Sequence, residues 1–329
     1  MRSLYVSQQG CYVSLQQETL QVHHRSQVLQ QIQLPHLEQI LIFGKSQITT
    51  QAIRACLWRN IPIVYLSRMG YCYGRVMSIE RGYRHLQRYQ QELVLGDRVT
   101  LARAIVAGKL KNSRTLLLRQ QRQRHLPQLD PIIPRLEALA QQAQNTTALD
   151  KLMGLEGAGA AQYFSALGQC LTHPDFDFIA RSKRPPLNPV NALLSFGYQV
   201  VWNHLLSLIE VQGLDPYYAC LHEGTERHAA LASDLIEEFR APVIDALVLS
   251  VINRRWLEVG RDFVYHQGGC YLNDQGRKRF LKAFLQRMEE PIKTESGLQP
   301  KWDILNQQVK AFKQFVYQPS RGYKPYQMR

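Results

Sequence analysis

The spacing of apolar residues changes near residue 80, and this change limits the fold more than any other feature of the chain. On its N-terminal side, short apolar runs are separated by turn-forming residues, as expected of strands. Five such runs lie at residues 3–6, 11–15, 19–22, 39–43 and 63–66. One helix interrupts them, marked by an apolar stripe that includes Ala52 and Cys56. This pattern predicts a small antiparallel β domain over residues 1–78.

On the C-terminal side of the change, apolar residues recur at helical spacing. The helices that we expect lie at about 83–95, from 101 into the basic stretch 109–124, and at about 190–211, 229–252 and 276–289. The predicted fold class is therefore α+β, with the small β domain followed by a larger all-α domain over residues 79–317. That larger domain carries every candidate catalytic residue.

Two local signals refine this division. Asn188 and Pro189 predict the start of a helix, because an asparagine side chain caps a helix and proline fits its first position. Residues 318–329 hold Arg321, Lys324 and Arg329 among glycine, proline and serine, so we expect them to form a mobile basic tail.

The balance of charge points to a polyanionic partner. Lysine and arginine number 40 against 26 aspartates and glutamates, which gives a net charge of +14. Such a surplus favours nucleic acid, although a generic basic surface would have the same composition. The basic stretch 109–124 surrounds an apolar Leu116–Leu118 run and fits either a solvated helix face or a helix that follows DNA.

Cysteine usage and hydropathy indicate the cellular compartment in which the protein resides. The six cysteines are scattered and form no CxxC pair, which argues against a thiolate zinc site or a disulfide framework and favours interior thiols of a reducing compartment. No apolar run approaches the roughly 20 residues of a membrane span, and the amino terminus lacks the apolar core of a secretory signal. We therefore expect a cytoplasmic protein without a membrane partner.

Glu156 is the acidic residue that most clearly breaks a local rule. It lies seven residues after Leu149 and seven before Tyr163, on the apolar stripe of its predicted helix. A carboxylate there needs a metal, a cation or hydrogen-bond donors to offset its burial. Gly157 and Gly159 follow it, and glycine within a helix suggests close approach of another element. A salt bridge to a buried arginine is the alternative to a metal.

A second candidate segment runs from His222 to Glu237. Gly224 and Thr225 indicate that His222 ends a loop before a helix, and in that helix Asp234 and Glu237 share a face. An imidazole and carboxylates form a mixed nitrogen and oxygen site that suits Mn²⁺ or Mg²⁺. The spacing of a helical zinc motif is absent, and His222 alone could equally be a structural histidine.

Three segments together resemble a known family, the CRISPR-associated spacer integrases (the Cas-one proteins). They read LMGLEGAGAAQYF around Glu156, RPPLNPVNALLSFGY from Arg184, and LHEGTERHAALASDLIEEFRAPVID from Leu221. Weaker similarity surrounds Lys109 and Lys278, so the resemblance extends over nearly the whole chain. It implies an N-terminal β domain, a helical catalytic domain and a homodimer.

The resemblance also implies roles for particular residues. The metal ligands and catalytic residues would be Glu156, His222 and Glu237, with Mg²⁺ or Mn²⁺ as the ion. Supporting residues would be Asp234, Asn191 and Ser195. The basic residues that would contact DNA phosphates are Arg181, Arg184, Arg227, Arg240 and Lys278. The implied partners are double-stranded DNA, both the incoming fragment and the repeat array, and a dimer of the small Cas-two protein.

The function implied is a metal-dependent DNA endonuclease and integrase that inserts fragments as new spacers by transesterification from a 3′ hydroxyl. Two other functions fit the same residues. One is a DNA-binding scaffold without catalytic activity, in which the three ligands are structural. The other is a purely hydrolytic nuclease that acts on branched DNA, in which water replaces the hydroxyl as nucleophile.

Overall fold

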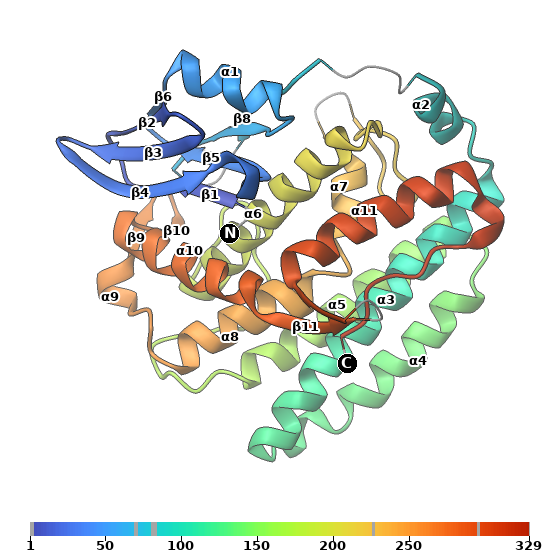
Figure 1. The fold of residues 1–329 in the computed structure, drawn as a ribbon. Helices are drawn as coiled ribbons and strands as arrows, with labels where there is room; N and C mark the ends of the chain where they lie inside the picture. Colours follow the sequence, from blue (N-terminus) through green and yellow to red (C-terminus); the bar gives the residue numbers. More distant parts are fainter. Residues whose placement is uncertain (1–2, 69–71, 80–83, 226–227, 295–296, 329) are drawn as a thin grey trace.

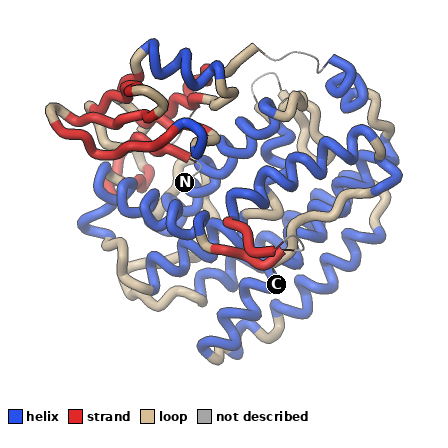
Figure 2. The backbone as a smooth tube through the Cα atoms, viewed as in Figure 1, coloured by secondary structure: helices blue, strands red, loops and turns tan. Residues whose placement is uncertain are grey.

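The protein is described by a computed structural model that covers residues 3–68, 72–79, 84–225, 228–294 and 297–328. Strands gather in its N-terminal part, and helices make up most of the remainder (Figures 1 and 2). The change falls between strand β8 (Cys72–Val76) and helix α2 (Arg84–Gln91), which confirms the α+β class. The helical part also contains two short hairpins, formed by β9 (Phe263–His266) with β10 (Gly269–Leu272) and by β11 (Pro291–Thr294) with β12 (Gly297–Pro300).

The first sheet is mostly parallel, so the prediction of an antiparallel domain is wrong for it. Its strands lie in the order β1 (Ser3–Val6), β5 (Gln39–Phe43), β7 (Ile63–Leu66) and β8, and the first three are parallel. The second sheet intervenes between β1 and β5, and helix α1 (Thr50–Trp58) crosses between β5 and β7. Each strand can therefore re-enter in the same direction. All of β5 is buried, as expected of a parallel strand covered on both faces.

The second sheet has the predicted antiparallel character. It consists of β4 (Gln27–Gln33), β3 (Thr19–His24), β2 (Cys11–Gln16) and the short β6 (Gln47–Ile48), in that order. Strands β2, β3 and β4 are antiparallel, and only β6 is parallel to its neighbour. The five predicted strands are confirmed, whereas β4, β6 and β8 were not predicted.

The first sheet separates two hydrophobic cores. Leu4, Ile40 and Ile42 point to the core shared with the second sheet and α1. Tyr5 and Phe43 lie on the opposite face and join the core of the helical part. This alternation is the ordinary period of a strand. The strand-rich part therefore packs directly on the helices, beside α6 (Figure 1).

The helical part is built on one long helix. Helix α3 runs for 30 residues, from Leu95 to Arg124, and the two helices that follow it pack along it. The described helices are α3, α4 (Ile132–Asn145), α5 (Leu149–Gln169), α6 (Pro189–Val211), α7 (Ala230–Ile236), a π-helical turn (Arg240–Asp245), α8 (Ala246–Asn253), α9 (Val259–Asp262), α10 (Asp274–Glu289) and α11 (Lys301–Tyr317).

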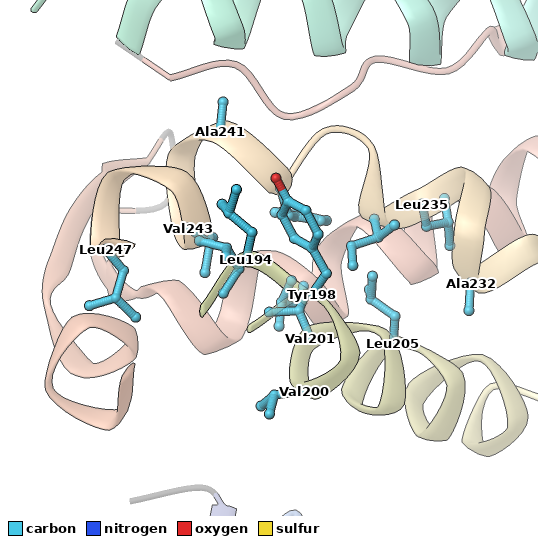
Figure 3. Close-up of a cluster of buried hydrophobic side chains, with 14 of the residues drawn as sticks. Leu194, Tyr198, Val200, Val201, Leu205, Ala232, Leu235, Ala241, Val243 and Leu247 are labelled. Atoms are coloured by element: carbon cyan, nitrogen blue, oxygen red, sulfur yellow. The ribbon is translucent and has the colours of Figure 1, made fainter. Parts of the chain in front are cut away.

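Helix α6 is the central core helix. The Asn188 side chain accepts a hydrogen bond from the Asn191 backbone N–H at 2.9 Å and Pro189 is the first helical residue, which confirms the predicted start. Helix α6 is long and apolar enough to cross a membrane, but 78% of its most apolar window is buried in the described structure. Figure 3 shows its apolar side chains facing α7 and the π-helical turn. Burial of this kind is that of a core helix.

The predicted mobile tail is wrong for residues 318–328. The Tyr323 hydroxyl and the Tyr326 backbone N–H both donate to the buried Glu238 carboxylate, and the Met328 N–H donates to Asn112 at 2.8 Å. The Tyr326 ring also stacks on Phe239. The composition suggested mobility, but the tyrosines carry enough apolar surface and hydrogen-bonding capacity to fix the segment.

Candidate metal centre

The candidate site begins where α3 and α5 face each other. Glu156 lies on the buried stripe of α5, between Leu152 and Gly159, as its sequence position predicted. Its carboxylate pairs with the Lys109 ammonium of α3. Both side chains are largely buried, with 19% and 11% of their surface exposed. The partner is therefore a lysine, where the sequence left a metal or a buried arginine open.

The close approach of these two helices depends on one glycine. A Cβ atom at Gly159 would lie 2.2 Å from a Leu110 methyl group of α3. A Cβ at Gly157 would meet no atom within 4 Å. The expectation that glycine permits close packing is thus confirmed for Gly159 and wrong for Gly157.

Glu237, at the end of α7, shares the same ammonium. Its Oε2 atom lies 2.6 Å from Lys109 Nζ, and its Oε1 atom lies 3.0 Å from an Arg240 Nη atom. Only 3% of the residue is exposed. Burial alone would raise the pKa of Glu237, but the charges of Arg240 and Lys109 outweigh it and lower the pKa to about 2. Glu237 is therefore ionised at every physiological pH.

Asp234 fixes the orientation of His222. The Asp234 carboxylate is fully buried and accepts hydrogen bonds from the backbone N–H groups of Cys220, Leu221 and His222. It also lies 2.8 Å from His222 Nδ1. With Nδ1 donating to a carboxylate, the Nε2 lone pair is free to bind a metal. Asp234 therefore contacts His222, and its predicted role in supporting a metal ligand stays a prediction.

The pKa of His222 is raised. Burial lowers it, but the hydrogen bond to Asp234 and the charges of Asp234 and Glu237 together outweigh burial. Glu237 and Lys109 both act electrostatically on this imidazole, so the His222 ring belongs to the same charged cluster as the two glutamates. The helix after His222 starts at Ala230, which confirms the predicted start near residue 229.

The donor set fits a divalent cation. Two carboxylates converge on a single cationic atom, Lys109 Nζ, and the His222 imidazole, held by Asp234, interacts electrostatically with Glu237 and Lys109. Oxygen and nitrogen donors of this kind suit Mg²⁺ or Mn²⁺. Across residues 3–68, 72–79, 84–225, 228–294 and 297–328, however, no three acidic, histidine or cysteine side chains are already grouped closely enough to hold an ion. Lys109 stands between two of them.

Arg240 packs against a buried polar network that Tyr198, Asp245 and Tyr163 form. The Arg240 guanidinium lies 4.5 Å from the centroid of the Tyr198 ring, and the Tyr198 hydroxyl donates to Asp245. Asp245 also accepts a hydrogen bond from Tyr163 at 2.6 Å. Burial raises the pKa of Asp245 to about 6. Figure 3 shows Tyr198 rising from α6 toward the π-helical turn.

Asn191 and Ser195 hold a predicted DNA contact rather than a metal ligand. Asn191 Oδ1 and Ser195 Oγ accept hydrogen bonds from Arg181, at 2.8 and 2.9 Å. The Arg181 guanidinium is half-buried and lies 5.6 Å from the Tyr198 ring centroid. Burial lowers its pKa. Its donors are largely used inside the protein, so it is placed to support the site more than to grip DNA.

The other predicted DNA contacts are dispersed. Arg184 is exposed on the loop before α6. Lys278 lies on α10, and its Nζ atom is 3.4 Å from Gln8 Oε1 of the strand-rich part. Arg227 lies outside the described residues. The structure brings Arg240 into the cluster with the metal ligands, but it does not bring Lys278 there.

Lys109 was missed as a site residue, although the sequence held the signal. It was assigned to a basic stretch, yet it follows Leu101 and Ile105 at intervals of four on the buried face of α3. The rule that singled out Glu156, a charged residue on an apolar stripe, applies equally to it. Asp245 and Tyr198 offered no comparable signal, because their pairing joins distant segments.

A cavity of about 710 Å³ opens beside His222. Its lining includes Arg98, near the start of α3, and Tyr217, Tyr218 and Glu223 of the loop before α7. The candidate site borders this cavity through His222.

Comparison with known proteins identifies the family. The model of the family described as CRISPR associated protein Cas1 matches residues 4–286. The chain belongs to the Cas1 family. A Thermus thermophilus CRISPR-associated endonuclease Cas1 is 32% identical over 295 residues, covering 90% of this chain and 89% of that protein. A Geobacter sulfurreducens Cas4 exonuclease/Cas1 endonuclease fusion is 34% identical over 300 residues, covering 88% of this chain but only 53% of the fusion.

Solved structures share the Cas1 fold. A CAS1 protein from Thermotoga maritima covers the whole of both chains with a TM-score of 0.80 and 24% identity. A casposase bound to an integration product has a TM-score of 0.81 and 19% identity, over 99% of this chain and 92% of that one. A chain of a Cas6-RT-Cas1–Cas2 complex has a TM-score of 0.82 and 23% identity, over 99% of this chain and 36% of that one.

Proposed function

We propose that this Cas1-family protein is a metal-dependent DNA endonuclease and integrase that inserts DNA fragments as spacers into a CRISPR array. The observation that carries the proposal is the convergence of Glu156 and Glu237 on one cationic position beside His222. The naming of its curated relatives as endonucleases supports cleavage of DNA. The casposase with its integration product supports integration as a use of this fold.

Glu156, Glu237 and His222 would hold Mg²⁺ or Mn²⁺. When bound, the ion would offset the negative charge that develops on the phosphate under attack and on the departing oxygen. By accepting from Nδ1, Asp234 would leave the Nε2 lone pair of His222 free to bind the ion. Arg240 stays ionised beside Glu237, because burial lowers its pKa but the charge and hydrogen bond of Glu237, together with Tyr198 and Asp245, outweigh burial and raise it.

The reaction that these groups would serve is a phosphodiester exchange. The 3′ hydroxyl of an incoming fragment attacks a phosphorus of the repeat, a new P–O bond forms, and the bond to the 3′ oxygen of the repeat strand breaks. The proton of the attacking hydroxyl is lost and the departing oxygen gains one, so no external energy source is needed. If water attacks instead, the same site hydrolyses DNA.

The proposed partners follow from the net charge of the chain and from the solved structures that share its fold. The net charge of +14 suits double-stranded DNA. The Cas1–Cas2 assembly among the fold's solved structures supports a Cas2 partner, and we propose a homodimer in a cytoplasmic complex with a Cas2 dimer. Arg184, Arg227 and Lys278 would contribute phosphate contacts, which position DNA without reading its sequence.

The test is strand transfer of a labelled fragment into a plasmid that carries a repeat array, with Mn²⁺, with Mg²⁺ and with EDTA. We expect joined products only with metal, and none from Glu156→Ala or His222→Ala protein. Transfer that survives either substitution would refute the site. Salt-sensitive DNA binding without any turnover would favour the scaffold function. Nicked products without joined ones would favour a purely hydrolytic nuclease.

A further inference from the structure

Lys109 occupies the point at which the two carboxylates of the site converge. Its ammonium contacts Glu156 on one side and Glu237 Oε2, at 2.6 Å, on the other. The carboxylate oxygens that would bind a divalent metal ion therefore already share one positive charge, that of the Lys109 ammonium. An ammonium and a metal ion cannot both lie between the same oxygens, because the two cations repel each other in a poorly solvated place.

The directly ion-paired charges at this point balance without any metal. Glu156 and Glu237 carry two negative charges, and Lys109 and Arg240 carry two positive ones. A divalent ion would leave the cluster with excess positive charge unless one cation moved away from it. The second cation is fixed, since the Arg240 guanidinium both pairs with Glu237 and lies 4.5 Å from the Tyr198 ring centroid.

Lys109 is the cation that can move. Its charge is a compact ammonium on a flexible four-carbon stem, and it makes its ion pairs only through that terminal atom. A bound DNA phosphate would offer the displaced ammonium a new partner of the same charge as the carboxylates. Exchange between carboxylates and phosphate would therefore keep Lys109 paired at every stage.

We propose that Lys109 is an exchangeable occupant of the metal site that couples metal binding to DNA binding. Without DNA its ammonium competes with the metal for Glu156 and Glu237. With DNA it turns to a backbone phosphate and releases the two carboxylates. By linkage, DNA tightens metal binding and metal tightens DNA binding by the same factor. The idea rests on the proposed metal-dependent function, since it specifies how that site is filled.

The experiment is a titration of the full-length protein with Mn²⁺, in which the electron paramagnetic resonance signal measures the concentration of free Mn²⁺. It is done with and without a short duplex whose strands end in 3′-deoxynucleotides, so that no strand transfer can occur. The variants are Lys109→Met, which keeps the length of the stem without the charge, and Lys109→Arg, which keeps a charge. Lys111→Met, two residues further along the same helix, is the matched control.

We expect Lys109→Met to bind Mn²⁺ at least about tenfold more tightly than the parent without DNA, because removal of one nearby positive charge favours a cation. The duplex should tighten Mn²⁺ binding to the parent and to the Lys111→Met control severalfold, and should leave Lys109→Met unchanged. Lys109→Arg should bind Mn²⁺ no more tightly than the parent.

Equal or weaker Mn²⁺ binding by Lys109→Met would overturn the coupling and leave Lys109 a structural residue. A circular-dichroism melt checks that the variant is folded, and Lys109→Gln replaces it if it is not. The two proposals fail differently. A parent protein that binds no Mn²⁺ contradicts the metal site itself, whereas binding that Glu156→Gln abolishes and Lys109→Met leaves unaltered contradicts the coupling alone.

Discussion

Glu237 and Asp262 are both buried carboxylates that contact two basic side chains, yet they are built differently. Asp262, at the end of α9, accepts from the Glu258 backbone N–H at 2.9 Å and from Arg261 and Arg279. These donors are two guanidinium groups and one backbone N–H, and Arg261 also pairs with Glu258 at 3.2 Å. Glu237 pairs with the Arg240 guanidinium and with the Lys109 ammonium, and that ammonium is shared with a second acid, Glu156. The first arrangement is neutralised by guanidinium groups and backbone alone, whereas the second depends in part on an ammonium that we propose to be exchangeable.

This difference predicts which cluster serves the fold and which serves chemistry. Burial would raise the pKa of Asp262, but the hydrogen bonds from Arg261 and Glu258 outweigh it and lower the pKa. Both acids are thus ionised, so charge state does not distinguish them. Substitution of each acid, with measurement of both stability and metal binding, tests whether Glu237 and Asp262 have these different roles.

The largest expected effect follows Glu237→Gln. An amide keeps the shape but removes the charge that a divalent ion needs, and such an ion contributes several kcal/mol to the transition state. We expect strand transfer by the folded protein to fall by at least about 1,000-fold, well beyond what the loss of stability from the broken Arg240 and Lys109 pairs can explain. Assays of joined product alongside a thermal melt check this. A fall in stability that matches the loss of activity would place Glu237 with Asp262 as a structural acid.

Asp262→Asn should do the reverse. It leaves Arg261 and Arg279 without their shared acid and weakens the acceptor of the Glu258 backbone N–H, so we expect the free energy of unfolding to fall. Urea denaturation measures that loss, and the Mn²⁺ affinity of the folded fraction should equal that of the parent. Weaker Mn²⁺ binding would show that the two clusters are energetically connected.

Asp234→Asn should have an intermediate effect on the metal site. The carboxylate orients His222 and accepts three backbone N–H groups, and loss of such a supporting acid typically costs about 10–100-fold in metal affinity. Mn²⁺ titration of Asp234→Asn and of the parent measures it. Unaltered affinity would mean that His222 needs no orientation by this acid.

The smallest effect concerns Asp245 and the pH dependence of stability. Burial raises its pKa from the ordinary 3.8 to about 6, so between these values the folded protein keeps a proton that the unfolded chain releases. The contribution of Asp245 is therefore greatest below about pH 4 and declines as the pH rises through 6. Asp245→Asn should remove this decline. Denaturation at pH 4 and at pH 7 tests it, and an unchanged slope would contradict the prediction.

The sequence predicted the α+β order and Glu156 from physical rules, and His222 and Glu237 mainly through family resemblance. Periodicity reports which face of an element is buried, and so it located Glu156. It cannot report which strand lies beside which, and so the parallel sheet was missed. It also cannot report which charges meet across helices: Lys109 became a site residue only when α3, α5 and α7 were placed together.

The candidate centre is assembled from segments that lie far apart along the chain. Lys109 and Glu156 are 47 residues apart, and Asn112, one turn beyond Lys109, reaches the Glu238 carbonyl across 126 residues. Contacts between residues so far apart in sequence form late in folding, because the chain loses the entropy of closing a long loop before it gains the energy of the contacts. A partly folded chain therefore holds single acids and no centre. The proposed centre is therefore complete only once the helices that carry its residues have packed together.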